Sequence, residues 1–386
     1  MTNDKKRIVI LFPYPWFPQA PTILGLYDYL KEKAEVKILT LYNPKRGSIL
    51  DNPDFIYLNQ YKTRQKEWFE VKRSYFAYQL LKLKRIIWRK AERKYKILNT
   101  DWLLYGHAIK KYLKQFPADE IIAVDPAPAF LCQRWGKSYH FLSTELQTER
   151  LMEMKDLDIA SIRSVIIQNE QRFNLLTIEG VKQLNHVFYI QNAPVFKMPE
   201  KRTVPSNRLI FAGGLWDGFG FKHCLALIRK YKKYTLTLKG TPLSDIEACK
   251  QEYAEEIKEG RLVIDTAYAS KSDFDELLQD HSIGFSFYDT GHPEISKSKE
   301  HYLTAPSGKM FTYFGLGIPV IGSFGLKEID SFEAGITLQD FSPDSLNAAI
   351  ETILADYSTY SANALKASSY YSFDKLVKPF ADFILD

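Results

Sequence analysis

Residues 305–321 decide the fold of this chain, and they read APSGKMFTYFGLGIPVI. Ser307 is suited to cap a helix that runs from about Lys309 to Leu316. Gly317 stands where a helix end needs a residue that tolerates a positive φ. The apolar residues from Ile318 onward then lead into a buried strand. A short helix followed directly by a buried strand indicates an α/β architecture.

The same stretch has two readings. Gly308 allows close approach of the backbone, and Lys309 adds a positive charge at the start of the helix. Free N–H groups and the helix dipole favour a phosphate group at such a place. The alternative is an ordinary helix–strand unit whose lysine is solvated, and the spacing alone leaves both open.

The rest of the chain repeats the α/β pattern twice. Residues 7–12 predict a strand buried on both faces, 22–33 a helix and 36–41 a second strand, as in a parallel sheet. The pattern restarts at Arg208–Ala212. A length of 386 residues suits two such domains. We therefore expect two doubly wound, Rossmann-like domains, at 1–195 and 207–371, joined by a linker at 196–206 and followed by a terminal helix at 372–386 that crosses back to the first domain.

Two acidic residues end predicted strands of the first domain. Asp125 ends a strand over 119–125, and Glu145 ends a strand over 139–145. Since ligands of open α/β sheets bind outside the carboxyl ends of the strands, Asp125 is expected to face a crevice and to act on an acceptor hydroxyl. Its alternative role is to cap the turn before Pro126. The next segment, 166–176, predicts a helix.

Residues 62–96 are strongly basic, with 13 Lys and Arg against three acids, and contain no Gly or Pro. Interleaved aromatic residues such as Trp68 and Trp88 make this a candidate helix for an anionic membrane surface. A helix packed by its apolar side with a solvated basic face is the second reading. Contact with nucleic acid is the third, and no nucleic-acid module signature supports it.

The amino-acid composition limits the electrostatic partners and the cellular compartment that we expect for this chain. Residues 1–200 hold 32 basic and 21 acidic residues, whereas the remainder is net acidic, so the two halves face different electrostatic partners. Cys132, Cys224 and Cys249 have neither metal nor disulfide spacing, which indicates a reduced, cytoplasmic compartment. The N-terminus does not read as a signal peptide, and no apolar run approaches the ~20 residues of a membrane span.

The motifs within residues 305–321 resemble those of a known protein family. Ser307-Gly-Lys309, Tyr313 and Gly317-Ile-Pro-Val-Ile321 resemble the donor-binding signature of family-4-like glycosyltransferases (glycosyl transferases group 1), which have the GT-B fold of two Rossmann-like domains facing a cleft. The resemblance implies a nucleotide-sugar donor as substrate and retention of the anomeric configuration. We expect no separate cofactor and, because the acids and histidines of 289–306 lack metal-ligand spacing, no metal site. The donor-binding residues that we predict are Gly213, Gly214, Lys239, Thr266, Tyr268, Ser307, Gly308, Lys309 and Thr312.

The sequence also departs from that family. Gly213-Gly-Leu215 stands where members usually have an arginine for the diphosphate. Thr304 and Thr312 stand at the positions of a pair of glutamates. Charge at the diphosphate therefore rests on Lys309, with Lys239 and Lys222 as further candidates, and both an unusual donor and a loss of activity stay open.

Together these features predict a cytoplasmic glycosyltransferase that acts on a glycan or lipid-linked acceptor at the inner face of the membrane. Lys309 and Asp125 are the candidate catalytic residues, Trp16 and Glu145 the candidate acceptor contacts, and residues 289–306 a candidate lid. An inverting reaction with Asp125 as base is an alternative. Two rivals of other classes are a nucleotide-sugar epimerase of the same fold and a binding protein that has lost its donor contacts.

Overall fold

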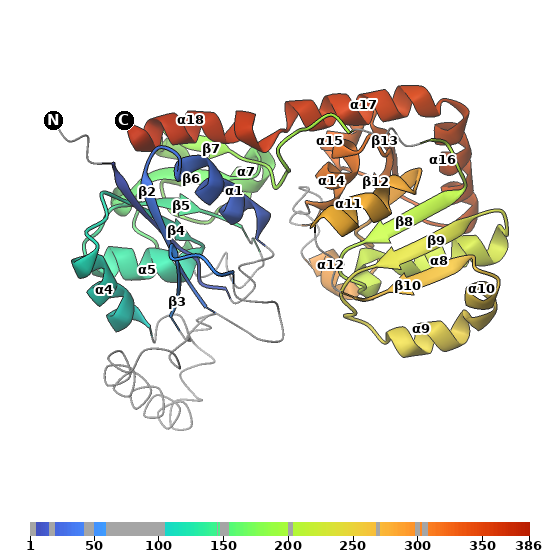
Figure 1. Cartoon of the computed structure of the whole chain (residues 1–386), viewed down its shortest axis with the longest axis horizontal. Helices are drawn as coiled ribbons and strands as arrows, with labels where there is room; N and C mark the ends of the chain where they lie inside the picture. The colour runs from blue at the N-terminus through green and yellow to red at the C-terminus, as the bar shows by residue number, and fades with distance from the viewer. Residues whose placement is uncertain are drawn as a thin grey trace. The chain divides into compact units, whose positions relative to one another are not determined.

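The computed structural model describes residues 5–14, 20–41, 50–58, 105–144, 146, 154–199, 204–267, 271–297, 302 and 308–386. They form two compact units (Figure 1). The first contains Met1–Gln191 together with Leu376–Asp386, and the second contains Asn192–Lys375. The division falls beside the Asn192-Ala-Pro194 turn and again within the last helix, α18 (Phe373–Leu385).

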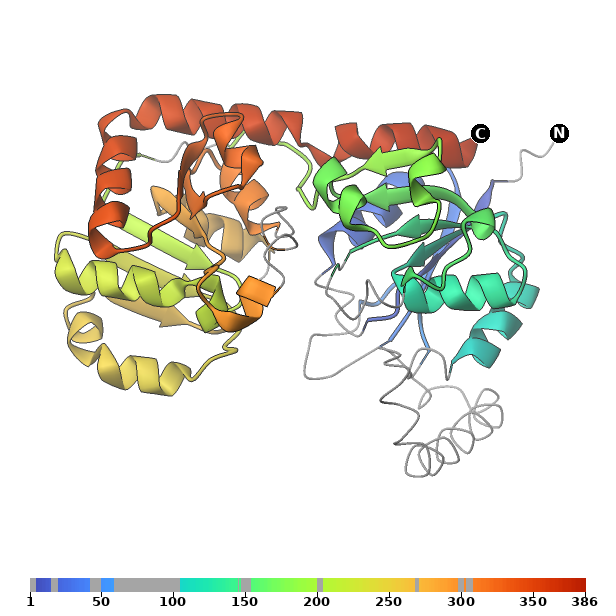
Figure 2. The same cartoon turned by 180° about the vertical axis from the view of Figure 1, so that it is seen from behind.

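The first unit is built on a parallel sheet with strand order β3-β2-β1-β4-β5-β6-β7. Its strands are β1 (Arg7–Leu11), β2 (Glu35–Thr40), β3 (Phe55–Tyr57), β4 (Glu120–Val124), β5 (Tyr139–Leu142), β6 (Ile162–Ile167) and β7 (Val187–Tyr189). Its helices are α1 (Pro21–Leu30), α4 (Gly106–Gln115), α5 (Pro126–Arg134) and α7 (Glu170–Leu175), with short 3-10 segments η2 (Ile159–Ser161) and η3 (Val181–Gln183). Figures 1 and 2 show α18 and α5 on opposite faces of this sheet. Coverage of both faces explains why β1 and β4 are continuous apolar runs.

The end of α18 packs on the first unit around a buried histidine. The ring of His140 contacts the rings of Phe380 and Phe383, at centroid distances of 5.5 and 5.9 Å. Lys6 donates a hydrogen bond to the carbonyl of Ile384 (3.0 Å). His140 also lies 3.0 Å from Glu120 through Nε2 and 2.8 Å from Ser164 through Nδ1. The last residues of the chain therefore complete the packing of this unit.

The second unit has a parallel sheet of order β10-β9-β8-β11-β12-β13. Its strands are β8 (Arg208–Ala212), β9 (Thr235–Lys239), β10 (Leu262–Asp265), β11 (Ile283–Ser286), β12 (Val320–Ser323) and β13 (Gly335–Leu338). Its helices are α8 (Phe221–Lys230), α9 (Ile246–Glu252), α10 (Ala254–Lys258), α11 (Lys271–Gln279), α12 (Pro293–Lys297), α14 (Lys309–Gly315), α15 (Lys327–Asp330), α16 (Pro343–Ala355) and α17 (Tyr357–Tyr370), with the 3-10 segment η4 (Asp217–Phe219). Numbered along the chain from β8, the order is the 3-2-1-4-5-6 of nucleotide-binding folds.

Helix α14 lies where the opening stretch of sequence predicts it. Tyr313 is fully buried, and its hydroxyl accepts a hydrogen bond from the backbone N–H of Ala212 at the end of β8 (2.9 Å). Gly317 has φ +70°, as the helix end requires, and its N–H bonds to the carbonyl of Phe314 (3.0 Å). The aromatic residue of the motif therefore fixes α14 to the central strand of the sheet.

Three local predictions are corrected. Residues 162–167 form strand β6, paired with β5 and β7, so the helix predicted over 166–176 is confined to α7. The β-branched run from Val165 to Ile167 suits a strand buried on both faces. The N-cap of α14 is Gly308, without a side-chain hydrogen bond, and Ser307 lies outside the described residues. The segment predicted as a loop after Asp289 contains the short helix α12.

Candidate functional site

In each unit the strand order reverses direction at one point, and ligand-binding crevices form at such points. In open parallel sheets, ligands bind at the carboxyl ends of the two strands between which the strand order reverses direction. In the second unit these strands are β8 and β11, and in the first they are β1 and β4. The residues just after β8 are Gly213 and Gly214, and the residue just after β4 is Asp125. Predicted site residues of both units therefore lie at these two points.

Gly213 belongs to a tightly packed pair of turns. Its φ is +125°, and its N–H donates to the carbonyl of Lys239 (2.9 Å). The neighbouring Gly240 has φ +155°, and a methyl group there would lie 1.6 Å from the carbonyl oxygen of Gly213. Only glycine allows this approach. The backbone at the end of β8 is thus held open for a ligand without an intervening side chain.

Lys309 reaches this backbone from α14. A methyl group on Gly213 would lie 3.6 Å from Cδ of Lys309 and 4.0 Å from its Nζ. The Nζ atom lies 4.4 Å from the ring centroid of Phe211 and 5.7 Å from that of Phe219. Burial among these groups lowers the pKa of Lys309 to about 8. A poorly hydrated ammonium group at this point is suited to gain an anionic ligand.

The other lysines proposed for the diphosphate are bound elsewhere. Lys239 is buried, and its Nζ donates to Asp265 Oδ2 (2.6 Å) and to the carbonyl of Ala267 (2.9 Å). Lys222 is exposed and pairs with Asp217 (2.6 Å). Of the three candidates, only Lys309 has its ammonium group against the Gly213 turn, which makes it the strongest candidate for a phosphate contact.

The other residues predicted to bind the donor lie in different environments, and two of them are outside the described residues. A methyl group on Gly214 would lie 2.9 Å from Cδ1 of Leu243, an exposed side chain that can move aside. The hydroxyl of Thr312 donates to the carbonyl of Gly308 within α14 (3.2 Å). Thr266 is exposed after β10. Tyr268 and Ser307 lie outside the described residues.

The structure adds polar and aromatic residues that the sequence reasoning missed. His223 of α8 lies 3.2 Å from Asp289, which follows β11 (Nε2 to Oδ2). The rings of Trp216 and His292 are in edge contact, with centroids 4.8 Å apart. Asp289 could have been found in the sequence, because it follows the apolar run that forms β11 and begins the candidate lid at 289–306. The contacts of Trp216 join loops that are far apart in the sequence, and no local pattern predicts them.

Asp125 has an unusual backbone and a fully engaged carboxylate. Its φ is +60°, rare for a residue other than glycine, and its side chain has no exposed surface. Oδ2 accepts hydrogen bonds from the hydroxyls of Tyr14 (2.5 Å) and Thr144 (2.6 Å), and Oδ1 accepts one from the N–H of Thr144 (2.8 Å). It does not cap the following helix through its side chain. Tyr14, buried at the end of β1, was not predicted.

The predicted acceptor contacts Trp16 and Glu145, and the whole basic segment 62–96, lie outside the described residues. Among the described residues, no helix is long and apolar enough to span a membrane. No three His, Cys, Asp or Glu side chains in the described ranges form a cluster that could hold a metal ion.

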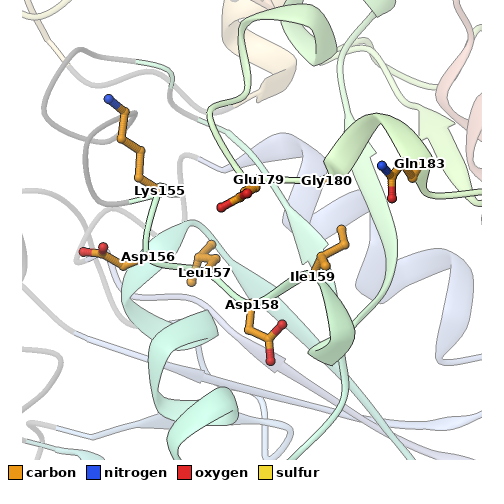
Figure 3. Close-up of a pocket in the computed structure, with 8 residues that line it drawn as sticks. All are labelled: Lys155, Asp156, Leu157, Asp158, Ile159, Glu179, Gly180 and Gln183. Carbon is orange, nitrogen blue, oxygen red and sulfur yellow. The ribbon is translucent and has the colours of Figure 1, made fainter.

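A separate surface hollow of about 460 Å³ occurs in the first unit (Figure 3). It is lined by Lys155, Asp156, Leu157, Asp158, Ile159, Glu179, Gly180 and Gln183. None of these residues belongs to the predicted donor or acceptor sets. The hollow is therefore distinct from the residues at the strand ends.

Comparison with known proteins gives the fold. No protein-family model matches the chain, and no curated protein matches it in sequence. Solved structures do match: HepE of Anabaena, solved with UDP and glucose, has a TM-score of 0.65 and 12% identity and covers 98% of this chain and 99% of its own. Sucrose-phosphate synthase of Thermosynechococcus elongatus has a TM-score of 0.64 and 15% identity, with 98% and 97% covered. The lipopolysaccharide outer core galactosyltransferase WaaB has a TM-score of 0.59 and 12% identity, with 98% and 99% covered. With its two parallel Rossmann-like sheets and this full-length similarity, the chain adopts the predicted GT-B fold of these glycosyltransferases.

Proposed function

We propose that this chain is a glycosyltransferase that moves a sugar from a nucleotide-sugar donor to a glycan or lipid-linked acceptor. The observation that supports this most is the position of Lys309 against the Gly213 turn, at the point of the second sheet where the strand order reverses. A partly buried cation beside an open glycine backbone suits a diphosphate. The similar HepE structure holds UDP and glucose, which agrees with this class of donor.

The donor lies on the second unit in this proposal. Lys309 and the Gly213–Gly214 turn contact the diphosphate, and the segment after β10, from Thr266 to Tyr268, contacts the base. As the bond to the sugar breaks, negative charge grows on the leaving diphosphate. Lys309 stabilises that charge electrostatically. We expect transfer to proceed with retention, as the family resemblance implies. We also expect it to persist in the presence of EDTA, because the lysine supplies the positive charge.

The acceptor lies on the first unit, at the edge marked by Tyr14 and Asp125. We place the reaction at the cytoplasmic face of the membrane, because the 13 basic residues of 62–96 would attract anionic lipids. Sedimentation with vesicles tests this part by itself. Binding to vesicles that contain anionic lipid, weakened by salt and absent with neutral vesicles, would support it, and equal binding to both would contradict it.

One observation favours a binding protein that lacks catalysis. The arginine and the paired glutamates implied by the family resemblance are absent, and Gly214 and Thr312 stand in that region instead. The packing favours a working donor site, because the glycines at 213 and 240 and the partly buried Lys309 still form one continuous arrangement. An epimerase of the same fold would convert a nucleotide sugar with no acceptor present.

The test is a thermal-shift panel of UDP, GDP, CMP and dTDP and their sugars, followed by transfer and hydrolysis assays with whichever donor binds. Binding of the native state by one nucleotide should raise the melting temperature. Stabilisation together with sugar transfer supports the transferase, and stabilisation without any turnover supports the binding protein. Absence of stabilisation by all of them would contradict the donor site.

A further inference from the structure

Asp125 occupies the reversal point of the first sheet in a conformation that its own residue type disfavours. Its N–H bonds to the carbonyl of Leu142 at the end of β5 (2.8 Å), while φ is +60° and ψ is 178°. Among the described residues other than glycine, only Glu333 also has a positive φ. Such backbone strain persists where the surroundings enforce it and is concentrated at functional sites. The strained backbone therefore marks Asp125 as a candidate functional residue.

The carboxylate joins the ends of three strands. Tyr14 follows β1, Asp125 follows β4 and Thr144 follows β5. Oδ2 accepts hydrogen bonds from both hydroxyls and Oδ1 accepts one from the N–H of Thr144, at 2.5 to 2.8 Å. The side chains of Asp125 and Tyr14 are 0% and 1% exposed. One buried anion thus organises the edge of the sheet on both sides of the reversal point.

The network continues in both directions from this centre. Arg172 of α7, fully buried, donates from Nη2 to the carbonyl of Thr144 (3.1 Å). At the other end, the hydroxyl of Thr40, at the end of β2, donates to the carbonyl of Tyr14 (3.2 Å). Buried polar networks of this kind select one arrangement of the groups that they connect.

We propose that Asp125 is a positioning residue, which holds Tyr14 and Thr144 in one arrangement at the edge where the acceptor binds. A general base must come within hydrogen-bond reach of the proton that it removes. The oxygens of Asp125 instead face protein donors and have no exposed surface. Asp125 therefore acts on the acceptor through the partly exposed Thr144, while the buried Tyr14 fixes the carboxylate from the other side. The inference rests on the proposed function for the nature of the ligand, a sugar hydroxyl acceptor, and on the geometry for the role of the residue.

The experiment compares Asp125→Asn, Tyr14→Phe and Thr144→Val, each of which removes part of the network. Asparagine cannot accept all three hydrogen bonds, because its NH2 group replaces one of the two carboxylate oxygens that accept them. We expect each variant to raise the KM for acceptor by roughly 10- to 100-fold, because small displacements of positioning groups have effects of this size. The double variant Tyr14→Phe with Asp125→Asn should be no worse than Asp125→Asn alone. Hydrolysis of the donor by water, the nucleotide thermal shift and the shape of the pH profile should stay as in the wild type.

Thr144→Ser is the matched control, since it keeps the hydroxyl and should retain the wild-type KM. The proposal is overturned if Asp125→Asn loses roughly 100- to 10,000-fold in kcat and one limb of the pH profile while Tyr14→Phe behaves as wild type, because that is the signature of a base. It is also overturned if Tyr14→Phe and Thr144→Val leave the acceptor KM unchanged.

A second measurement separates this inference from the proposed function. Hydrogen exchange at the Thr144 amide, which donates to Asp125, should accelerate in Asp125→Asn and in Tyr14→Phe but not in Thr144→Ser. If the wild type turns over no nucleotide sugar, the proposed function is wrong. The exchange rate of the Thr144 amide in Tyr14→Phe still tests the hydrogen-bond network, because it does not depend on activity. An unchanged rate in that variant would show that the carboxylate does not hold Tyr14 and Thr144 together.

Discussion

The ammonium group of Lys309 lies 4.4 Å from the centroid of the Phe211 ring, at the carboxyl end of β8. A lysine and a central strand that are almost 100 residues apart in the sequence thus share one small space with the Gly213 turn. Burial lowers the affinity of this lysine for its proton, and an anionic ligand would restore it. Two predictions follow from this contact.

Lys309→Met keeps the aliphatic stem and removes the charge. We expect nucleotide affinity to fall at least ~10-fold, since a charge-assisted hydrogen bond contributes roughly 1.5–3 kcal/mol. Stability without ligand should hold, because a poorly hydrated charge is replaced by an apolar group. Thermal shift with and without nucleotide measures both quantities. Lys222→Met is the control, since Lys222 is exposed and paired with Asp217. Equal loss of affinity in both variants would contradict the assignment.

The pKa of Lys309, lowered to about 8, predicts a pH dependence of two quantities. Between pH 8 and the ordinary value of 10.5 the unfolded chain holds a proton here that the folded chain has lost, so the free energy of unfolding gains a contribution that rises with pH. Nucleotide binding requires the protonated form and should weaken above pH 8, with uptake of a proton near that pH. Calorimetry in buffers of different ionisation enthalpy measures the uptake. If Lys309→Met shows the same uptake, another group is responsible.

Gly240→Ala should disrupt the turn that supports the site. The added methyl group would lie 1.6 Å from the carbonyl oxygen of Gly213, at φ +155°. We expect a loss of more than ~3 kcal/mol, beyond the ~1 kcal/mol of an unfavourable φ alone. Gly260→Ala is the matched control, because it has φ +70° with nothing within 4 Å of the added group. Urea denaturation compares the two, and equal losses would contradict the close approach.

Lys239→Met should lower stability more than nucleotide affinity. Lys239 donates to Asp265 and to the carbonyl of Ala267, and its hydrogen bond lowers the pKa of Asp265. Loss of the lysine leaves a half-exposed carboxylate without this partner, at roughly 1–3 kcal/mol. Pyrophosphate is a suitable probe because it carries no base. Loss of pyrophosphate binding comparable with that of Lys309→Met would make Lys239 a direct phosphate ligand.

Acid should weaken the contact between the end of α18 and the first unit. Burial lowers the pKa of His140 below 6.5, so the unfolded chain takes up a proton first and stability falls as the pH drops through that value. Burial acts to raise the pKa of Glu120, but hydrogen bonds from His140 and Arg163 outweigh it and lower it, which extends the loss to lower pH. Protection factors for hydrogen exchange in residues 376–386, which correct for the slower intrinsic exchange at lower pH, should fall between pH 7.5 and 5.5. His107→Gln, at an exposed position of α4, should keep this response, whereas His140→Gln should reduce it.

The sequence by itself determined the architecture. Apolar runs such as Arg7–Leu11 and Arg208–Ala212, each followed by a helix and a second strand, specify parallel α/β units because such strands must be covered on both faces. It also located the α14 motif and its terminal Gly317, since these depend on local backbone preferences. It misjudged 166–167, because the short apolar run Val165–Ile167 fits a helix or a buried strand equally well and the neighbours β5 and β7 decide.

Only the tertiary structure decided where each charge lies. Lys309 is the first candidate in the sequence, and Lys239 and Lys222 are further ones. In the fold Lys239 and Lys222 pair with Asp265 and Asp217, whereas Lys309 lies against the Gly213 turn. Asp125 was predicted from its position after a strand, but Tyr14 and Thr144, which occupy its oxygens, lie 111 and 19 residues away. Periodicity and spacing record the local backbone, whereas burial and hydrogen-bond partners arise from strands that meet only in the folded sheet.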